Sequence, residues 1–340
     1  MDYSNKGQNQ VLLAHGDGGL LTAELVNNIF LKHFDNPLLR QLSDAAVFSL
    51  PRGRLALTTD SFVVNPIFFP GGDIGKLAVC GTVNDLAVSG AFPLHLAASF
   101  IIEEGFPLAG LERIAASMAA TCAESRVTVV TGDTKVVPRG HADKIFITTT
   151  GVGQVMKGRE LGPHRIQPGD LVIVSGNLGD HGLAVLAARE NLGLAGPISS
   201  DCAPLNQIIK TLLENCPGVR IMRDLTRGGL ATAAREIARS GGMDIHLREE
   251  LLPISPAVQA GSSLLGLDPL YLANEGKFMA IIGRGQADKA IDLIRQNHYG
   301  QSTRVIGEVR QGKGNLYLKT ALGGTRILDL LSGSPLPRIC

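Results

Sequence analysis

The chain has no tryptophan and only four tyrosines among its 340 residues, and neither sign of charge is in excess. Few aromatic rings are available as stacking platforms, so a carbohydrate-binding protein is disfavoured. Thirty-two Lys and Arg residues balance 31 Asp and Glu residues, which argues against a disordered chain and against a surface that binds polyanions. We therefore expect a folded enzyme and no nucleic-acid partner.

Signals for secretion and for membrane insertion are also missing. Residues 1–10 are polar and lack the basic start and the apolar run of a secretory signal. The longest weakly charged stretch, 78–102, contains Asn84, Asp85 and Pro93, which a bilayer core does not accept without a special reason. We expect a cytoplasmic protein with no transmembrane helix and no membrane partner.

The five cysteines form no C-x-x-C pair and show no metal-ligand spacing. In a reducing cytosol, four of them are expected to be ordinary buried thiols. Cys340 differs because the sequence ends with it, after a stretch that contains Pro335 and Pro337. These prolines favour an extended backbone, and nine extended residues reach about 30 Å. We expect 332–340 to be a mobile tail that can carry the Cys340 thiol into a cleft.

Strand-like and helical patterns alternate along the chain and predict two mixed α/β halves. A stretch rich in Gly, Pro and charge, 156–169, interrupts the pattern. The predicted domains are 1–155 and 156–331, followed by the tail. The pattern predicts helices over 74–89, 108–122, 181–190, 205–213 and 229–239, and strands over 55–59, 127–131, 145–150, 171–175, 244–247 and 278–282.

Aspartates at predicted strand ends or inside apolar runs are the main candidates for metal binding. Taken singly, each can be a helix cap or a turn residue. Together they indicate Mg²⁺, which prefers carboxylate and water oxygens and is commonly shared with substrate phosphates. The set is Asp44, Asp60, Asp85, Asp133 and Asp224.

Glycines accompany these acids and favour phosphate binding, because their backbone N–H groups can converge on oxygens. No Walker A sequence is present. Lys135 follows Asp133 by two residues, so an extended strand places both side chains on one face, where an ammonium suits a transferring phosphoryl group. A surface salt bridge is the alternative. The candidates for nucleotide binding besides the aspartates are Gly18, Gly19, Thr226, Gly228 and Gly229.

Glu275 is the candidate proton acceptor. It lies between apolar runs, where burial would raise its pKa, although Lys277 could instead neutralise it. His15 and His181 lie beside glycines, so either could touch a ligand; the other histidines are expected to be structural or exposed.

These motifs resemble the aminoimidazole ribonucleotide synthetase-like superfamily of ATP-dependent enzymes, which includes thiamine-monophosphate kinase and selenophosphate synthetase. The resemblance covers the chain from His15 to Cys340. The strings that carry it are 43–47, 59–61, 84–91, 131–135 and 223–229. Residues 273–277 and the ending Pro337-Arg338-Ile339-Cys340 resemble one branch, the HypE family of hydrogenase expression/formation proteins.

The resemblance implies a two-domain α/β fold whose N-terminal, ATP- and metal-binding domains pair into a dimeric β-barrel. It also implies a homodimer. Proteins of this branch receive a carbamoyl group on the terminal cysteine from the carbamoyltransferase HypF. They use ATP and Mg²⁺ to dehydrate the thiocarboxamide to a thiocyanate, and the cyano group passes to iron on a HypC–HypD complex. Here the carrier would be Cys340, and the product would supply the cyanide ligands of [NiFe]-hydrogenase.

Carried over by position, the five aspartates match the superfamily's magnesium- and phosphate-binding acids. Lys135 is expected to stabilise the transferred phosphoryl group or the amide oxygen. Glu275 is expected to accept the proton. Ser43 departs from the pattern, since relatives often carry a second acid there. Two alternatives stay open: a phosphotransferase for a small molecule, and a non-catalytic scaffold that presents Cys340. A diffusible substrate gives no reason for a cysteine-tipped tail, and the intact set of acids speaks against a scaffold.

Overall fold

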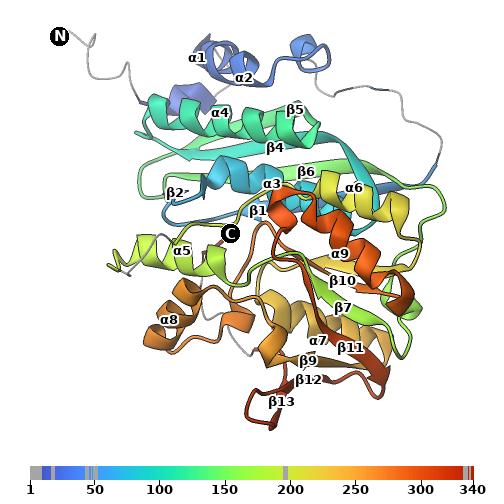
Figure 1. The fold of residues 1–340 in the computed structure, drawn as a ribbon. Coiled ribbons are helices and arrows are strands. Elements are labelled where there is room, and N and C mark those ends of the chain that lie inside the picture. Colours follow the sequence, from blue (N-terminus) through green and yellow to red (C-terminus); the bar gives the residue numbers. More distant parts are fainter. Residues whose placement is uncertain are drawn as a thin grey trace.

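The computed structural model describes residues 10–16, 20–42, 46, 48, 53–193, 198–331, 336 and 338–340. These residues form two mixed α/β parts, each built around one sheet, as the sequence predicts. Figure 1 shows the N-terminal part above the C-terminal part. Among the described helices, none is long and apolar enough to cross a membrane.

The N-terminal part contains a four-stranded sheet in the order β1-β6-β4-β5, so β1 and β5 are its edges. β4 and β5 run parallel, and the other neighbours are antiparallel. Its elements are α1 (Leu20–Leu25), the π-helix η2 (Val26–Leu31), α2 (Lys32–Phe34), β1 (Leu55–Phe62), β2 (Phe68–Phe69), β3 (Gly72–Asp73), α3 (Ile74–Val88), β4 (Ala91–Glu103), α4 (Leu108–Ser125), β5 (Thr128–Val137) and β6 (Ile145–Val155).

Helix α3 connects the two parts of the molecule. Asp73 caps its start by accepting hydrogen bonds from the N–H groups of Gly75 and Lys76, at 2.8 and 3.1 Å. All of its residues except Lys76 and Asp85 are buried, because it packs on β1 and β6 on one side and against α6 and β8 of the C-terminal part on the other. The helix thereby holds Asp85 at the junction of the two parts.

The C-terminal part contains a seven-stranded sheet in the order β13-β12-β9-β11-β7-β10-β8. Only the β12–β9 pair among these described strands is parallel. Its elements are β7 (Leu171–Val174), α5 (Asp180–Arg189), α6 (Asn206–Asn215), β8 (Val219–Asp224), α7 (Gly229–Gly241), β9 (Met243–Arg248), α8 (Pro256–Leu265), β10 (Phe278–Ile282), α9 (Ala287–Arg295), β11 (Arg304–Gln311), β12 (Leu316–Lys319) and β13 (Thr325–Leu328).

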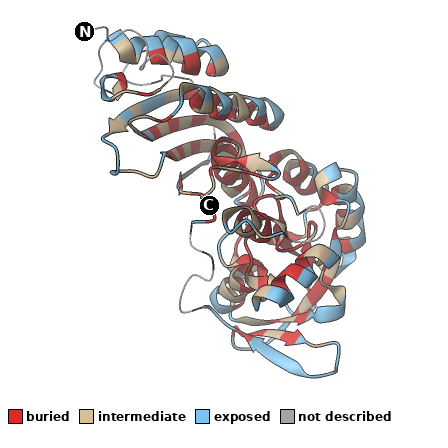
Figure 2. Ribbon diagram, turned by 90° about the vertical axis from the view of Figure 1, so that its left-hand side faces the viewer, coloured by how far each residue is buried: buried red, intermediate tan, exposed pale blue. Residues whose placement is uncertain are grey.

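The end of the chain lies at the junction between the two parts, as both Figure 1 and Figure 2 show. Of the predicted tail, Leu336 and residues 338–340 are described, and 332–335 and 337 lie outside the described residues. The Ile339 side chain is buried in the N-terminal core. The described end of the tail is therefore packed inside the molecule.

Candidate functional site

A small pocket at the junction of the two parts encloses Cys340; we call it the Cys340 pocket. Its volume is about 50 Å³. Residues from β1, α3, the end of β8, the loop before α7 and the loop before β10 surround the thiol. They are Asp60, Ser61, Phe62, Gly81, Asp85, Asp224, Thr226, Arg227 and Glu275. The structure thus brings six of the predicted site residues together: three aspartates, Thr226, Glu275 and Cys340.

Strand β1 turns alternate side chains towards α3, and this places Asp60 in the pocket. Gly81 allows the close packing of α3 on β1, since a Cβ there would lie 2.8 Å from the Phe62 ring. Asp85 on α3 also lines the pocket, and its carboxylate accepts a hydrogen bond from Thr58 Oγ1 at 2.9 Å. Packing between strand and helix therefore places two carboxyl groups side by side.

Burial and mutual repulsion disfavour the ionised forms of the carboxyl groups of Asp60 and Asp224. Burial, and then Asp85, raise the pKa of Asp60 to about 6, and the same two causes raise the pKa of Asp224 to about 7. Asp60 Oδ2 is buried and has no hydrogen-bond partner among the described residues. Within those residues, no three Asp, Glu, His or Cys side chains converge closely enough to hold a metal ion by themselves.

Glu275 is buried, with 2% of its surface exposed. Burial, followed by Cys202 and Asp224, raises its pKa well above the ordinary value. Lys277 does not neutralise Glu275, because it pairs with Asp201 at 3.5 Å. Gly276 is required in this loop, since a Cβ there would lie 1.9 Å from the Asp201 carbonyl oxygen.

The Cys340 side chain lies beside Glu275 in this pocket. Burial and the neighbouring Glu275 raise the pKa of the thiol, so the sulfur is protonated in this position. The four other cysteines are buried and not in disulfides, as the sequence predicts. Because Cys340 is enclosed here, the structure corresponds to the inward position of the predicted tail.

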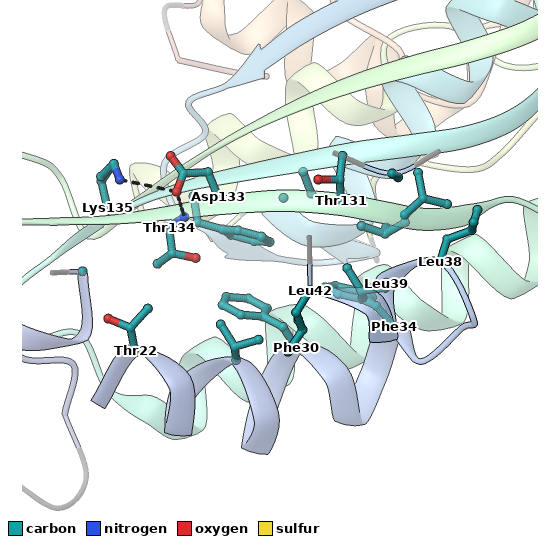
Figure 3. Close-up of a pocket in the computed structure, with 18 residues that line it drawn as sticks. Thr22, Phe30, Phe34, Leu38, Leu39, Leu42, Thr131, Asp133, Thr134 and Lys135 are labelled. Carbon is teal, nitrogen blue, oxygen red and sulfur yellow. Dashed lines mark hydrogen bonds and ion pairs between the residues drawn. The ribbon is translucent and has the colours of Figure 1, made fainter. Parts of the chain in front are cut away.

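Asp133 and Lys135 lie elsewhere, beside a second pocket of about 370 Å³ between β5 and the N-terminal helices; we call it the β5 pocket. Lys135 Nζ lies 3.4 Å from Asp133 Oδ1, so both side chains share a face as predicted. Figure 3 shows Thr134 pointing towards the helix, and Asp133 and Lys135 pointing to the other side of the strand. Phe30 and Phe34 form part of its apolar wall.

Within one chain, the two pockets are separated by the width of the sheet. Asp133 is aligned through Ser99 and Thr148 with Ser61 on β1. Three strand spacings of about 4.8 Å place Asp133 roughly 14 Å from β1. A single chain therefore does not bring Asp133 and Lys135 to Cys340.

The remaining predicted residues have other positions. Gly228 and Gly229 have φ of +76° and +59° and form the turn that begins α7, and they do not line the Cys340 pocket. A Cβ on Gly229 would lie 2.5 Å from the Leu272 carbonyl oxygen. Asp44, Gly18 and Gly19 lie outside the described residues.

Sequence reasoning missed Arg227, which lines the Cys340 pocket and is exposed. Its side chain acts electrostatically to lower the pKa values of Asp60 and Cys340. The only sequence signal was its place beside Thr226 in the run 223–229.

Comparison with known proteins finds family matches in both halves of the chain. The N-terminal domain of AIR synthase related proteins matches residues 42–155, and their C-terminal domain matches residues 167–319. The carbamoyl dehydratase HypE of Cupriavidus necator is 49% identical over 330 residues, which cover 96% of this chain and 94% of that protein.

Solved structures agree with this assignment. The hydrogenase maturation protein HypE in complex with ATP superposes with a TM-score of 0.94 at 46% identity, covering 97% of this chain and 99% of that one. A chain of a HypE–HypF complex superposes with a TM-score of 0.80 at 46% identity, covering 90% and 99%. The chain therefore belongs to the AIR synthase related family and, within it, to the HypE carbamoyl dehydratases of hydrogenase maturation.

Proposed function

We propose that this protein uses ATP to convert a carboxamide, carried on the sulfur of its own Cys340, into a thiocyanate. The observation that carries the proposal is that the Cys340 thiol lies beside the Glu275 carboxyl group in one small pocket. A scaffold that only presents a thiol has no need to bury it against a carboxyl group. The names of the relatives and the ATP complex of a similar structure support the same reaction.

The reaction removes the elements of water from an amide. Phosphorylation of the carboxamide oxygen by ATP makes that oxygen leave as phosphate, and two N–H protons are lost as the C≡N bond forms. In sum, Cys-S-C(=O)NH₂ and ATP give Cys-S-C≡N, ADP, phosphate and a proton. An enzyme for this reaction must therefore place a base beside the amide nitrogen.

Glu275 has the position and the basicity for that role. A group attached to the Cys340 sulfur would lie next to the Glu275 carboxyl group, which lines the same pocket. Burial raises the pKa of Glu275, so its carboxylate, once formed, is a stronger base than an exposed one. Asp201 holds the loop by accepting a hydrogen bond from the Glu275 N–H at 3.0 Å.

The carboxyl groups of the Cys340 pocket fit Mg²⁺. Asp60, Asp85 and Asp224 supply the oxygens that Mg²⁺ prefers, and Asp60 Oδ2 has no protein partner among the described residues. When bound with nucleotide, Mg²⁺ would neutralise this negative charge and that of the phosphates. Asp44 stays a proposed further ligand by resemblance.

The nucleotide needs more room than the Cys340 pocket offers. Sites for ligands of this size occupy about 300–1,000 Å³, and the β5 pocket, at about 370 Å³, falls in that range. Its apolar wall suits a base, and the backbone of Gly16 at its border suits phosphates. Gly18, Gly19, Thr226, Gly228 and Gly229 stay proposed as further nucleotide contacts.

A homodimer would join the two pockets. The strands at the edges of the four-stranded sheet, β1 and β5, have unused backbone groups, and Leu57 and Ile101 expose apolar surface on one face of this sheet. Pairing of two sheets, with β5 of one chain beside β1 of the other, would close a barrel. It would also bring Lys135 of the partner subunit to the strand that carries Asp60.

Loading of the sulfur requires the opposite, outward position of the tail. We propose that HypF carbamoylates Cys340 there, since a similar chain is found in a complex with HypF, and that a HypC–HypD complex accepts the cyano group. The working units would be domains 1–155 and 156–331 and the tail 332–340. Free cysteines suit a reducing compartment, in keeping with a cytoplasmic protein.

Mass spectrometry of the C-terminal peptide tests the proposal. The protein is incubated with the carbamoyltransferase, carbamoyl phosphate and ATP, with Cys340→Ala as the control. Loading adds a carbamoyl group to Cys340, and dehydration then removes about 18 Da, the mass of one water. A carbamoylated peptide that never loses this mass in the presence of ATP would exclude the dehydratase reaction.

A further inference from the structure

The last residues of the tail are held by their side chains and by their backbone carbonyl groups: Arg338 pairs with Asp143 at 2.7 Å, and the Ile339 side chain is buried. The Arg338 carbonyl oxygen accepts hydrogen bonds from the Asn65 N–H at 3.3 Å and from Arg189 Nη2 at 2.5 Å. The Ile339 carbonyl oxygen lies 2.9 Å from His181 Nε2. These contacts fix the peptide groups that immediately precede Cys340.

The contact with Ile339 defines the proton positions on His181. A carbonyl oxygen only accepts, so Nε2 must carry the proton and donate it. Nδ1 then accepts from the Ser200 hydroxyl group, at 2.8 Å. Burial lowers the pKa of His181, which keeps the ring neutral, and the Phe69 ring packs edge-on against it with centroids 5.5 Å apart. The ring is therefore fixed in both orientation and tautomer.

The segment 200–203 links this histidine to the proposed base. Ser200 Oγ, which donates to His181, accepts from the Cys202 N–H at 3.1 Å. Asp201 accepts from the Glu275 N–H, and the Ala203 N–H donates to the Glu275 carbonyl oxygen at 3.3 Å. One short segment thus holds both the residue that binds the tail and the loop that carries Glu275.

We propose that His181 is a positioning residue: by donating to the Ile339 carbonyl oxygen, it holds the tail inward and places the group on the Cys340 sulfur opposite Glu275. This inference rests on the proposed function. His181 acts on the tail peptide and not on the reacting atoms, so it should be needed for dehydration and not for loading, which takes place in the outward position.

The test compares three variants of the full chain. His181→Leu removes the donor, and His181→Gln keeps an amide N–H at a similar reach. His246→Leu is the matched control, because His246 stacks on Tyr317 in the C-terminal sheet, with centroids 4.8 Å apart. The first readout is the rate at which iodoacetamide alkylates Cys340 without nucleotide, followed by mass spectrometry of the C-terminal peptide.

Loss of one buried hydrogen bond is expected to accelerate alkylation of Cys340 in His181→Leu by about tenfold. The His181→Gln and His246→Leu variants should stay within about twofold of the wild type. The second readout is the carbamoylated chain: His181→Leu should be loaded at least as fast as the wild type and dehydrated about tenfold more slowly.

The proposal would be overturned if Cys340 in a folded His181→Leu variant were alkylated at the wild-type rate. It would also be overturned if Cys340 were alkylated as fast in His181→Gln as in His181→Leu. If His181→Leu does not fold, Ser200→Ala decides, since it frees the His181 ring: faster alkylation supports the proposal and an unchanged rate overturns it. Alkylation does not depend on the reaction. Suppose that the variants show the expected alkylation rates but the wild-type chain is never dehydrated. That result would contradict the proposed function and leave the role of His181 intact.

Discussion

The thiol of Cys340 lies beside the carboxyl group of Glu275, and this neighbour helps to raise the pKa of the thiol. Burial is the larger cause of the raised pKa at both residues. A neutral thiol is a poor nucleophile. The inward sulfur is therefore protected from side reactions, and its loading by a partner requires that the tail first leave the pocket.

Replacement of Glu275 by Gln should stop dehydration without stopping loading. The amide keeps the size of the side chain and removes the base, so we expect a loss of at least about 100-fold in the rate of thiocyanate formation. Mass spectrometry would show a carbamoylated C-terminal peptide that accumulates. Glu250→Gln, at the surface, is the control, and a wild-type rate in Glu275→Gln would remove this residue from the mechanism.

Replacement of Asp224 by Asn should stabilise the protein at high pH. The folded-state pKa of Asp224 is raised to about 7, so its favourable contribution is present below its unfolded pKa and is lost as the pH rises through 7. In EDTA we expect the variant to gain about 2 kcal/mol in free energy of unfolding at pH 8 and little at pH 4. Denaturant unfolding at both pH values measures this.

The surface residue Asp292 provides the control for that experiment, as Asp292→Asn. A gain from Asp224→Asn of the same size at pH 4 and pH 8 would contradict the electrostatic explanation. It would indicate that the amide simply packs better than the carboxyl group.

Replacement of Leu57 by Lys should dissociate the proposed dimer. Leu57 is 75% exposed in the single chain, and a charge at this position would be buried if two sheets close into a barrel. Leu264 on α8 is equally exposed, which makes Leu264→Lys a matched control. Sedimentation analysis should find a monomer for the first variant and a dimer for the second; two dimers would exclude this interface.

Two inactive variants should complement each other if the site is shared between subunits. A Lys135→Ala chain paired with a Cys340→Ala chain has one complete site, with Cys340 from one chain and Lys135 from the other. Random mixing makes half of the dimers mixed, so about a quarter of wild-type activity should return. Activity that stays at the level of the separate variants would place Lys135 and Cys340 of the same chain in one site.

Much of the fold could be predicted because apolar periodicity is local. The stripe over 108–122 predicts α4, and the buried run at 278–282 coincides with β10. β4 was not predicted, because both of its faces carry apolar residues and Pro93 lies at a register shift, so no simple alternation appears. The strands β11 to β13 have mixed polar sequences and were also missed.

The site was predicted by residue type better than by position. The position of acids at strand ends or beside apolar runs was the signal for Asp60, Asp85, Asp224 and Glu275, which the fold gathers at one point. Sequence spacing does not give strand order, and this is why Asp133 was grouped with acids that lie across the sheet. His181 and Ile339 are far apart in the sequence, so their hydrogen bond is a long-range contact that no local pattern predicts.

The position of Cys340 has a consequence for the stability of the product. The sulfur lies at the junction of the two parts, and Ile339 beside it is packed in the N-terminal core. A group formed on the sulfur would share this sheltered position, with little access for a hydrolytic nucleophile. A reactive imidate phosphate or thiocyanate would thereby persist until the tail withdraws.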